Sequence, residues 1–446
     1  MPNKSRKNIN KSKIMIRQKF INILKNVGIS LIIVLIIGFV LYLLWHYRDR
    51  KLVDYKVEFV ETIPEEQQNF SFEKKIIVDN QVNLVTKKQR DIKASEDIKD
   101  LIELRTRKPV KVHGVYLPAY VVGNDEKYSI IFENIKKSNI NAIVVDVKDE
   151  LGRITFKMDN DFVKDMKTIE PQINDIDKFI NECKENNIYV IARIAAFIDE
   201  YAGVRNYKNL ALRKKDGKLY KDNSGYYWLN PYNEKVKEYL IEIGKGCAKA
   251  GFDEVQYDYF RFSADSGMRR VEFNEEETKG RTKIEIITEL AQEISKALIK
   301  ENIFVSIDVF GAIMNSYKDQ YSIGQEYQTL LKYVDYLCPM VYPSHYANQT
   351  FGLSVPDLYP YETVKSALET SKTVIDKTYD ISYHYGKVRP WLQGFTANYL
   401  SEFKNYEVED YLAQIKSVED TGNDEWIFWH PGGVYKWDAF IIKNNE

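Results

Sequence analysis

Carboxylates collect near the ends of short apolar segments in this chain. Five acids share this position: Asp146, Asp149, Glu150, Asp258 and Asp308. An interior strand face normally holds Val, Ile or Leu, so a carboxylate there must be paired or face a wet cleft. Two carboxyls with separated pKa values can cleave a glycosidic bond, because one protonates the departing oxygen while the other attacks or activates water. We therefore treat Asp258, Asp308, Asp146 and Asp149 as candidate catalytic residues, with Glu150 as a rival proton donor.

Cations near these acids allow a structural role as well. Asp258 could form a salt bridge with Arg261 or Lys148 that closes the fold, and a neighbouring hydroxyl or amide could hold Asp308. In the catalytic interpretation, Lys148 and Arg261 hold neighbouring charge at a substrate site. Gln256 shares one strand face with Asp258, since side chains alternate along a strand.

The segment that contains Asp149 and Glu150 leads directly into Gly152. A role in shaping that turn therefore competes evenly with a chemical role for these two acids.

Aromatic and amide side chains form a second group of candidates. Flat rings can stack on the apolar face of a sugar while polar groups bind its hydroxyls. A single ring of this kind is more often part of a core, so the cluster carries the argument. The candidate substrate-binding residues are Tyr116, Trp228, Tyr259, Tyr342, Trp391 and Trp429, with Gln393, His345 and His430 as hydrogen-bonding partners.

Other chemistries find little support. The histidines fit neither H-x-H nor H-E-x-x-H, the three cysteines are far apart, and no G-x-S-x-G motif occurs. We expect no metal and no cofactor. The Gly432 and Gly433 pair could shape a phosphate site and make the protein a phosphate-ester enzyme, but a simple tight turn is the preferred interpretation.

These residues need a scaffold, and eight strand-like segments alternate with helical ones after Pro109. The predicted strands are 112–118, 142–149, 189–197, 254–262, 304–311, 334–343, 389–395 and 425–433. Helical patterns at 128–139, 176–187, 234–251 and 284–302 lie between them.

Eight such units predict an α/β fold, a (β/α)8 TIM barrel over residues 109–446. A doubly wound open sheet is the alternative, although the first unit lacks a G-x-G-x-x-G motif. Polar residues at the carboxyl ends of barrel strands would then share one mouth.

The N-terminal region predicts a membrane anchor. Residues 27–45 run for 19 positions without a charge, close to the length that spans a bilayer. Eight Lys or Arg residues precede this run, so residues 1–26 should stay in the cytoplasm and the barrel should lie outside. We predict a single-pass anchor at 27–47 in the lipid bilayer of the cell membrane; a cleaved signal peptide is the alternative.

Residues 48–108 are polar and mixed in charge, and predict a spacer with a short helix near residues 98–104. Beyond residue 48 the chain holds 55 basic and 65 acidic residues, which disfavours nucleic acid as a partner.

The strings VVDVKDELGRITF, VQYDYFRFS, SIDVFG, CPMVYPSHY and WIFWHPGG resemble the bacterial family called putative glycosyl hydrolase, which is itself similar to alpha-amylase-type barrels. The resemblance covers about residues 111–440. It implies that Asp258, on the fourth strand, is the nucleophile and that a fifth-strand acid is the proton donor. Here the fifth strand offers Asp308 instead of the usual glutamate, and Gln256 stands where those enzymes tend to have arginine.

Two functions follow as expectations. The first is a membrane-anchored, extracytoplasmic glycoside hydrolase that acts on a cell-envelope or extracellular polysaccharide by carboxylate acid and base chemistry. The second is a barrel without catalytic activity that binds glycan and scaffolds envelope assembly. The sugar, the linkage and the oligomeric state are left open.

Overall fold

The computed structural model describes residues 88–207 and 209–441. Its centre is a closed parallel barrel in which β1 pairs with both β2 and β9, and β5 pairs with both β4 and β6. The predicted barrel is therefore confirmed, and the alternative, a doubly wound open sheet, is not present in the described residues. The strands are β1 His113–Leu117, β2 Ala142–Lys148, β3 Tyr189–Ala195, β4 Glu254–Asp258, β5 Phe304–Phe310, β6 Tyr336–Met340, β7 Lys387–Val388, β8 Trp391–Gln393 and β9 Trp426–Trp429.

The predicted strand at 389–395 is two short pieces. Both β7 and β8 pair with β6, so together they occupy one position in the barrel. Pro390 separates them because it has no N–H to donate to the sheet. The ladder continues around it: the Arg389 amide donates to the Leu337 carbonyl (3.0 Å) and the Pro390 carbonyl accepts from the Ile427 amide (3.0 Å).

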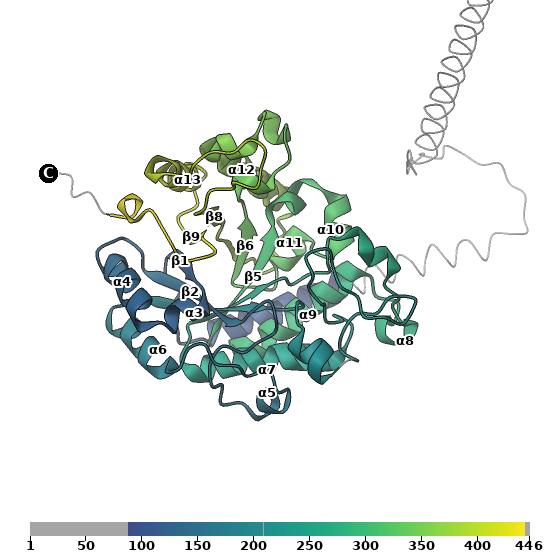
Figure 1. Cartoon of the computed structure of the whole chain (residues 1–446). Helices are drawn as coiled ribbons and strands as arrows, with labels where there is room; N and C mark the ends of the chain where they lie inside the picture. Colours follow the sequence, from purple (N-terminus) through teal and green to yellow (C-terminus); the bar gives the residue numbers. More distant parts are fainter. Residues whose placement is uncertain (1–87, 208, 442–446) are drawn as a thin grey trace, which may run out of the picture. The chain divides into compact units, whose positions relative to one another are not determined.

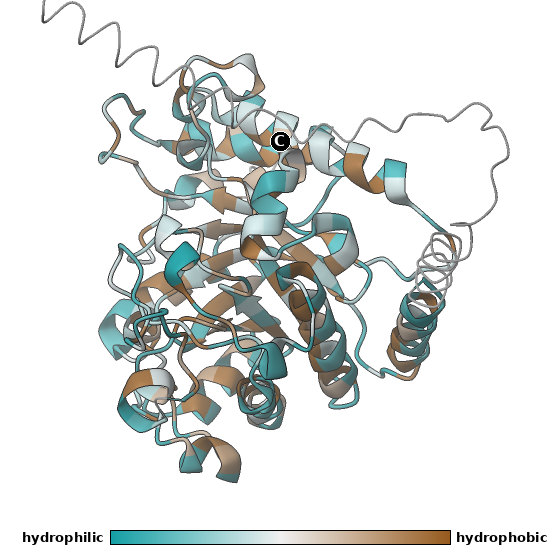
Figure 2. Cartoon of the chain, turned by 90° about the vertical axis from the view of Figure 1, so that its right-hand side faces the viewer, coloured by the Kyte–Doolittle hydropathy of each residue, from teal (hydrophilic) through white to brown (hydrophobic). Residues whose placement is uncertain are grey.

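Helices surround the barrel (Figure 1). Each of the four segments predicted to be helical forms a helix. In each of them, apolar side chains recur every three or four residues, so one face of the helix packs on the strands. Figure 2 shows the apolar residues concentrated on the strands and the polar ones toward the outside. The helices are α3 Ala119–Val122, α4 Asp125–Lys136, α5 Asp161–Asp165, α6 Ile176–Glu185, α7 Glu234–Ala250, α8 Glu275–Thr278, α9 Lys283–Ile299, α10 Tyr317–Ile323, α11 Tyr327–Leu330, α12 Pro360–Thr378 and α13 Val408–Asp420.

Residues 88–103 form a further helix, longer than the one predicted near 98–104. Ile98 on this helix packs with Ile299 and Tyr333 of the barrel. Just beyond the helix, Arg105 donates two hydrogen bonds to the Asp335 carboxylate (2.9 and 3.0 Å). This part of the predicted spacer is therefore in contact with the barrel.

No helix within residues 88–207 and 209–441 is long and apolar enough to cross a bilayer. The predicted anchor at 27–47 lies outside the described residues.

Candidate active site

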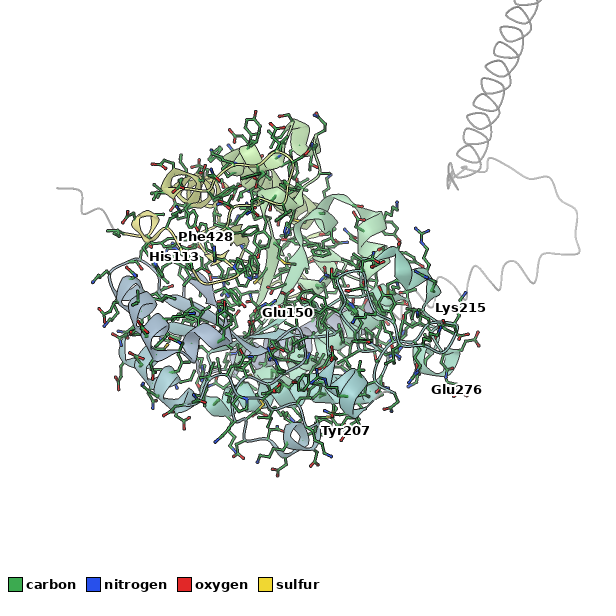
Figure 3. The ribbon with its side chains drawn as sticks, viewed as in Figure 1. His113, Glu150, Tyr207, Lys215, Glu276 and Phe428 are labelled. Atoms are coloured by element: carbon green, nitrogen blue, oxygen red, sulfur yellow. The ribbon has the colours of Figure 1, made fainter. Side chains whose placement is uncertain are left out.

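A cavity of about 910 Å³ opens at the carboxyl ends of the strands, within the usual size of small-molecule sites. One wall is polar and comes mainly from strands β2 to β5: Glu150, Arg193, Asp222, Asp258, Arg261 and Asp308. The opposite wall is mainly aromatic and comes from the segments that follow β6, β8 and β9: Tyr342, His345, Trp391, Phe395, Tyr399 and Trp429. Glu150 lies near the middle of the molecule, whereas Tyr207, Lys215 and Glu276 lie toward its edge (Figure 3).

Arg193 of β3 is the centre of the polar wall. Its guanidinium donates to Asp146 Oδ1 (2.5 Å), to Glu150 Oε1 (2.9 Å) and to Asp258 Oδ2 (2.7 Å from Nη2 and 3.1 Å from Nε). The acids of strands β2 and β4 therefore meet at one cation. Such charge-assisted bonds are stronger than neutral ones and fix the direction of each carboxylate.

Sequence reasoning did not select Arg193. Arg193 lies opposite Gln256 of β4 in the sheet register. The resemblance to amylase-type barrels implies an arginine at position 256, and here the neighbouring strand β3 supplies a guanidinium instead. A signal was present: Arg193 is the one charged residue in the otherwise apolar strand YVIARIA. A buried cation of this kind requires acids around it.

Asp258 ends β4 and faces the cavity, with 8 % of its surface exposed. The Tyr259 amide donates to its Oδ1 (2.6 Å) while Arg193 binds its Oδ2. Tyr259 has a φ of 51°, in the left-handed region that residues other than glycine rarely occupy. Strain of this kind concentrates at functional sites.

Asp308 of β5 lies in the same cavity but in drier surroundings, with 1 % of its surface exposed. The Trp391 indole N–H donates to its Oδ1 (2.7 Å). Burial, reinforced by the negative charge of Asp258, raises the pKa of Asp308 well above its ordinary value. Asp308 therefore holds its proton more tightly than an ordinary carboxyl group, and it shares the cavity with Asp258, which Arg193 binds.

Asp146 lies behind the polar wall and is not part of the cavity lining. The Tyr116 hydroxyl donates to its Oδ2 (2.5 Å) and Arg193 covers its Oδ1. Burial raises the pKa of Asp146 to about 7 against the opposing charge of Arg193. Asp146 and Tyr116 thus support Arg193 and do not face a ligand.

Glu150 reaches the cavity from the loop after β2. Burial acts to raise its pKa, but the charge and hydrogen bond of Arg193 outweigh burial and leave the pKa lowered. Glu150 is therefore a poor proton donor at neutral pH, in contrast to Asp308.

Two predicted site residues of the β2 segment point away from the cavity. Lys148 is fully buried and donates to the carbonyls of Ala195 (2.6 Å) and Ile198 (2.8 Å) while pairing with Asp199 (3.0 Å). It does not line the cavity, where we predicted that it would hold charge at a substrate site. Asp149 accepts from the amides of Leu151 (3.0 Å) and Arg153 (2.9 Å), so of the two roles considered the turn role fits its geometry.

The predicted amides also lie outside the cavity. Gln256 is fully buried within the barrel, where its Nε2 faces Cys338 Sγ (3.3 Å). Gln393 accepts from the Ser344 amide (3.0 Å) and donates to Asp357 (2.9 Å). Because these partners use its amide group, Gln393 fixes the loops that carry the aromatic wall and does not line the cavity.

The remaining predicted aromatic and histidine residues line the cavity: Trp228, Tyr259, Tyr342, His345, Trp391, Trp429 and His430. Tyr342, Phe395 and Trp429 contact one another, with ring centroids 5.3 to 6.1 Å apart. Burial lowers the pKa of His345 and of His430, so both offer neutral imidazoles to a ligand. Phe395, Tyr399 and Asp222 are lining residues that the sequence did not indicate.

The turn after β9 does not form a phosphate site. The amides of Gly432 (3.0 Å) and Val434 (3.2 Å) both donate to His430 Nδ1. They are therefore not free for an anion, and the preferred tight turn is present. The same bonds place the His430 proton on Nε2, which makes that atom a hydrogen-bond donor.

No group of three or more His, Cys, Asp or Glu side chains suited to a metal ion occurs within residues 88–207 and 209–441.

The comparisons with known proteins agree with this geometry. Residues 114–435 match the model of a family described as putative glycosyl hydrolase domain. The chain belongs to this family. A comparison with curated proteins found no match.

Among solved structures, the glycoside hydrolase domain of PgaB (BpsB) from Bordetella bronchiseptica aligns with a TM-score of 0.52 at 14% identity, over 75% of this chain and 100% of that one. A hypothetical protein from Ruminiclostridium thermocellum is 33% identical over 44% of this chain and 97% of its own, with a TM-score of 0.40. The spore cortex-lytic enzyme SleL of Bacillus megaterium aligns at 13% identity and a TM-score of 0.45, over 76% of this chain and 75% of that one. The first likeness supports the barrel fold of this family member.

Proposed function

We propose that this protein is a glycoside hydrolase that cleaves a cell-envelope or extracellular polysaccharide. The observation that carries the proposal is the pair of acids in one cavity, Asp258 held by Arg193 and Asp308 in a dry setting. A buried carboxyl group with a raised pKa is suited to donate a proton, and a carboxylate fixed by a cation in the same cavity is suited to act as nucleophile.

In the proposed reaction, Asp308 donates its proton to the departing glycosidic oxygen. Asp258 attacks the anomeric carbon, and water later releases the sugar from the carboxylate. Arg193 holds Asp258 in place and balances the charge of Glu150. Asp146 and Tyr116 act through Arg193, as positioning residues.

The aromatic wall supplies the sugar platform in this proposal. The rings of Tyr342, Phe395 and Trp429 offer stacking surfaces, and the Nε2 proton of His430 can bind a hydroxyl. A bilayer anchor at residues 27–47 would hold the barrel on the outer side of the cell membrane, where such polymers occur.

The test uses the full chain, purified in a mild detergent, against envelope and capsular glycans. New reducing ends are counted for the parent, Asp258→Asn and Asp308→Asn. Loss of either acid should lower kcat/KM by about 10²- to 10⁴-fold, as for other acid and base groups. In the parent, activity should fall as pH rises through the raised pKa of Asp308, because the proton donor is then lost.

If the parent retains glycan but produces no new reducing ends, the hydrolase proposal is rejected and the alternative, a barrel that binds glycan without cleaving it, is favoured. Cleavage by Asp258→Asn at the parent's rate would reject the assigned nucleophile.

A further inference from the structure

Arg261 is a buried cation without an acidic partner. It lines the cavity with 7 % of its surface exposed. Within the described residues its one hydrogen bond runs from Nη1 to the Phe262 carbonyl (3.0 Å), and no carboxylate oxygen lies within 4.0 Å of it. The guanidinium instead faces aromatic rings, with the centroid of Phe310 at 4.2 Å and that of Trp228 at 5.2 Å.

The other buried arginines of the barrel are all paired. Arg193 binds three acids, Arg389 binds Glu254 and Glu425, and Arg105 binds Asp335. Buried charges are normally neutralised in this way, since taking an unpaired ion out of water is costly. The N–H groups that Arg261 leaves unused line the cavity and are therefore available to a partner from outside the chain.

The acids on the same wall do not provide that partner. Asp222 accepts from the Tyr226 amide (2.8 Å) and from the Trp228 indole (2.9 Å). Asp265 accepts from the amides of Gly267 (2.7 Å) and Asn223 (2.6 Å). Both of these carboxylates are already bonded through both oxygens, and neither pairs with the Arg261 guanidinium.

Arg261 also lies close to the proposed reaction centre. The Tyr259 ring has the Arg193 guanidinium 6.0 Å from its centroid and the Arg261 guanidinium 5.4 Å from it. A group bound at Arg261 would thus belong to the sugar at the reaction centre or to its neighbour.

Resting on the proposed function, we propose that Arg261 binds a carboxylate carried by the substrate, so that the natural glycan contains an acidic sugar. A carboxylate matches the planar, forked donors of a guanidinium. Asp258 and Asp222 lie near enough to offset part of the positive charge of Arg261. A ligand with a single negative charge therefore suits the site better than a phosphate dianion. The carboxylate can be that of a uronic acid or that of a lactyl ether on an amino sugar.

Binding of small sugars to the full chain tests the proposal without requiring cleavage. The probes are glucuronate, galacturonate and N-acetylmuramate against glucose and N-acetylglucosamine, with glucosamine and glucose 6-phosphate as oppositely charged and dianionic controls. The variants are Arg261→Met and Arg261→Lys, and Arg205→Met is the matched control. Arg205 carries the same charge, but it pairs with Glu200 on the surface, outside the cavity.

We expect a carboxylate sugar to bind at least about tenfold more tightly than its neutral counterpart. Arg261→Met should remove this preference, Arg261→Lys should keep part of it, and Arg205→Met should keep all of it. Uronates and N-acetylmuramate distinguish the two sources of the carboxylate. Arg261→Met should also melt at the parent's temperature or higher, because the variant no longer buries an unpaired charge.

The proposal is overturned if neutral sugars, glucosamine or glucose 6-phosphate bind best, or if Arg261→Met keeps the carboxylate preference. A preference that depends on Arg261 in a chain that cleaves no glycan would support the carboxylate site and reject the hydrolase. Cleavage of neutral glycans, with a substrate preference that Arg261→Met does not change, would support the hydrolase and reject the carboxylate site.

Discussion

At the residue scale, the guanidinium of Arg193 binds three acids that come from different parts of the chain. Asp146 is packed behind it, Glu150 lies at the mouth and Asp258 faces the cavity. Burial raises the pKa of Asp146 despite the charge of Arg193, whereas the charge and hydrogen bond of Arg193 leave the pKa of Glu150 lowered. The site can therefore hold both protonated and ionised carboxyls at one pH.

Asp146 should make the stability of the protein depend on pH. Its pKa is raised to about 7 in the folded chain from an ordinary value of 3.8. Between these values the folded state keeps a proton that the unfolded state has lost, so stability falls as pH rises through this window. Asp146→Asn removes this contribution. Relative to the parent, the variant should gain stability from pH 4 to pH 7, by at most about 4 kcal/mol.

Urea unfolding at several pH values measures this effect. Asp125→Asn is a suitable control, since Asp125 lies on the surface. A parent and an Asp146→Asn variant that differ by the same free energy at pH 4 and pH 7 would contradict the assigned pKa.

The acids at the cavity could be predicted from sequence because carboxylates are rare on strands. Asp258 and Asp308 both reach it, and both could be recognised by their place in an apolar segment. The partners could not be recognised in the same way. Lys148 and Arg193 are both single cations in apolar strands, and only the three-dimensional packing shows that Lys148 turns toward Asp199 while Arg193 turns toward Asp258.

At the element scale, two adjacent acids in the segment after β2, Asp149 and Glu150, have different roles. Glu150 reaches the cavity, while Asp149 binds the backbone of its own turn and the side chain of Arg153 (2.7 Å). The turn continues through Gly152, whose φ of 91° and close approach to Asp199 leave no room for a Cβ.

Asp149→Ala should therefore weaken the fold more than the chemistry. Loss of the bonds to Leu151 and Arg153 should lower the free energy of unfolding by about 1 to 3 kcal/mol. The kcat/KM of the variant should stay within about tenfold of the parent's, in contrast to the loss expected for Asp258→Asn. Denaturant melts and reducing-end assays on both variants measure the two effects. A stable but inactive Asp149→Ala protein would return Asp149 to the list of catalytic candidates.

The order of strands and helices was predictable because each element repeats a simple pattern of apolar residues. The interruption at Pro390 was not assigned, although a proline inside a predicted strand is a recognised signal of a break. The pairing of both pieces with β6 depends on how the barrel closes, which no local pattern records.

At the scale of the whole molecule, the barrel has a different kind of polar network at each end. The cavity end holds the acids around Arg193. Beneath it, Arg389 bridges Glu254 of β4 and Glu425 near the start of β9 (2.9 and 3.0 Å). This network of ion pairs joins distant strands across the interior, which is a structural role.

The helix at residues 88–103 and the residues that follow it should act as part of the barrel. Arg105 and Asp335 are nearly buried, with 2% and 8% of their side chains exposed. Arg105→Met leaves the Asp335 carboxylate without its partner and should lower the free energy of unfolding by about 3 to 5 kcal/mol. Lys88→Met removes an exposed pair with Asp380 (3.5 Å) and should cost at most about 1 kcal/mol. Equal urea midpoints for the two variants would show that this segment is only a spacer.

Arg105 and Arg107 contact Asp335 and Asp253, the residues immediately before β6 and β4, so the polypeptide joins the barrel at the end opposite to the cavity. The described chain on the amino side of β1 is therefore fixed to the barrel behind the candidate active site. A bead attached at this end of the barrel would leave the entrance open to the bulk solution, where a long polymer could reach it without passing the support.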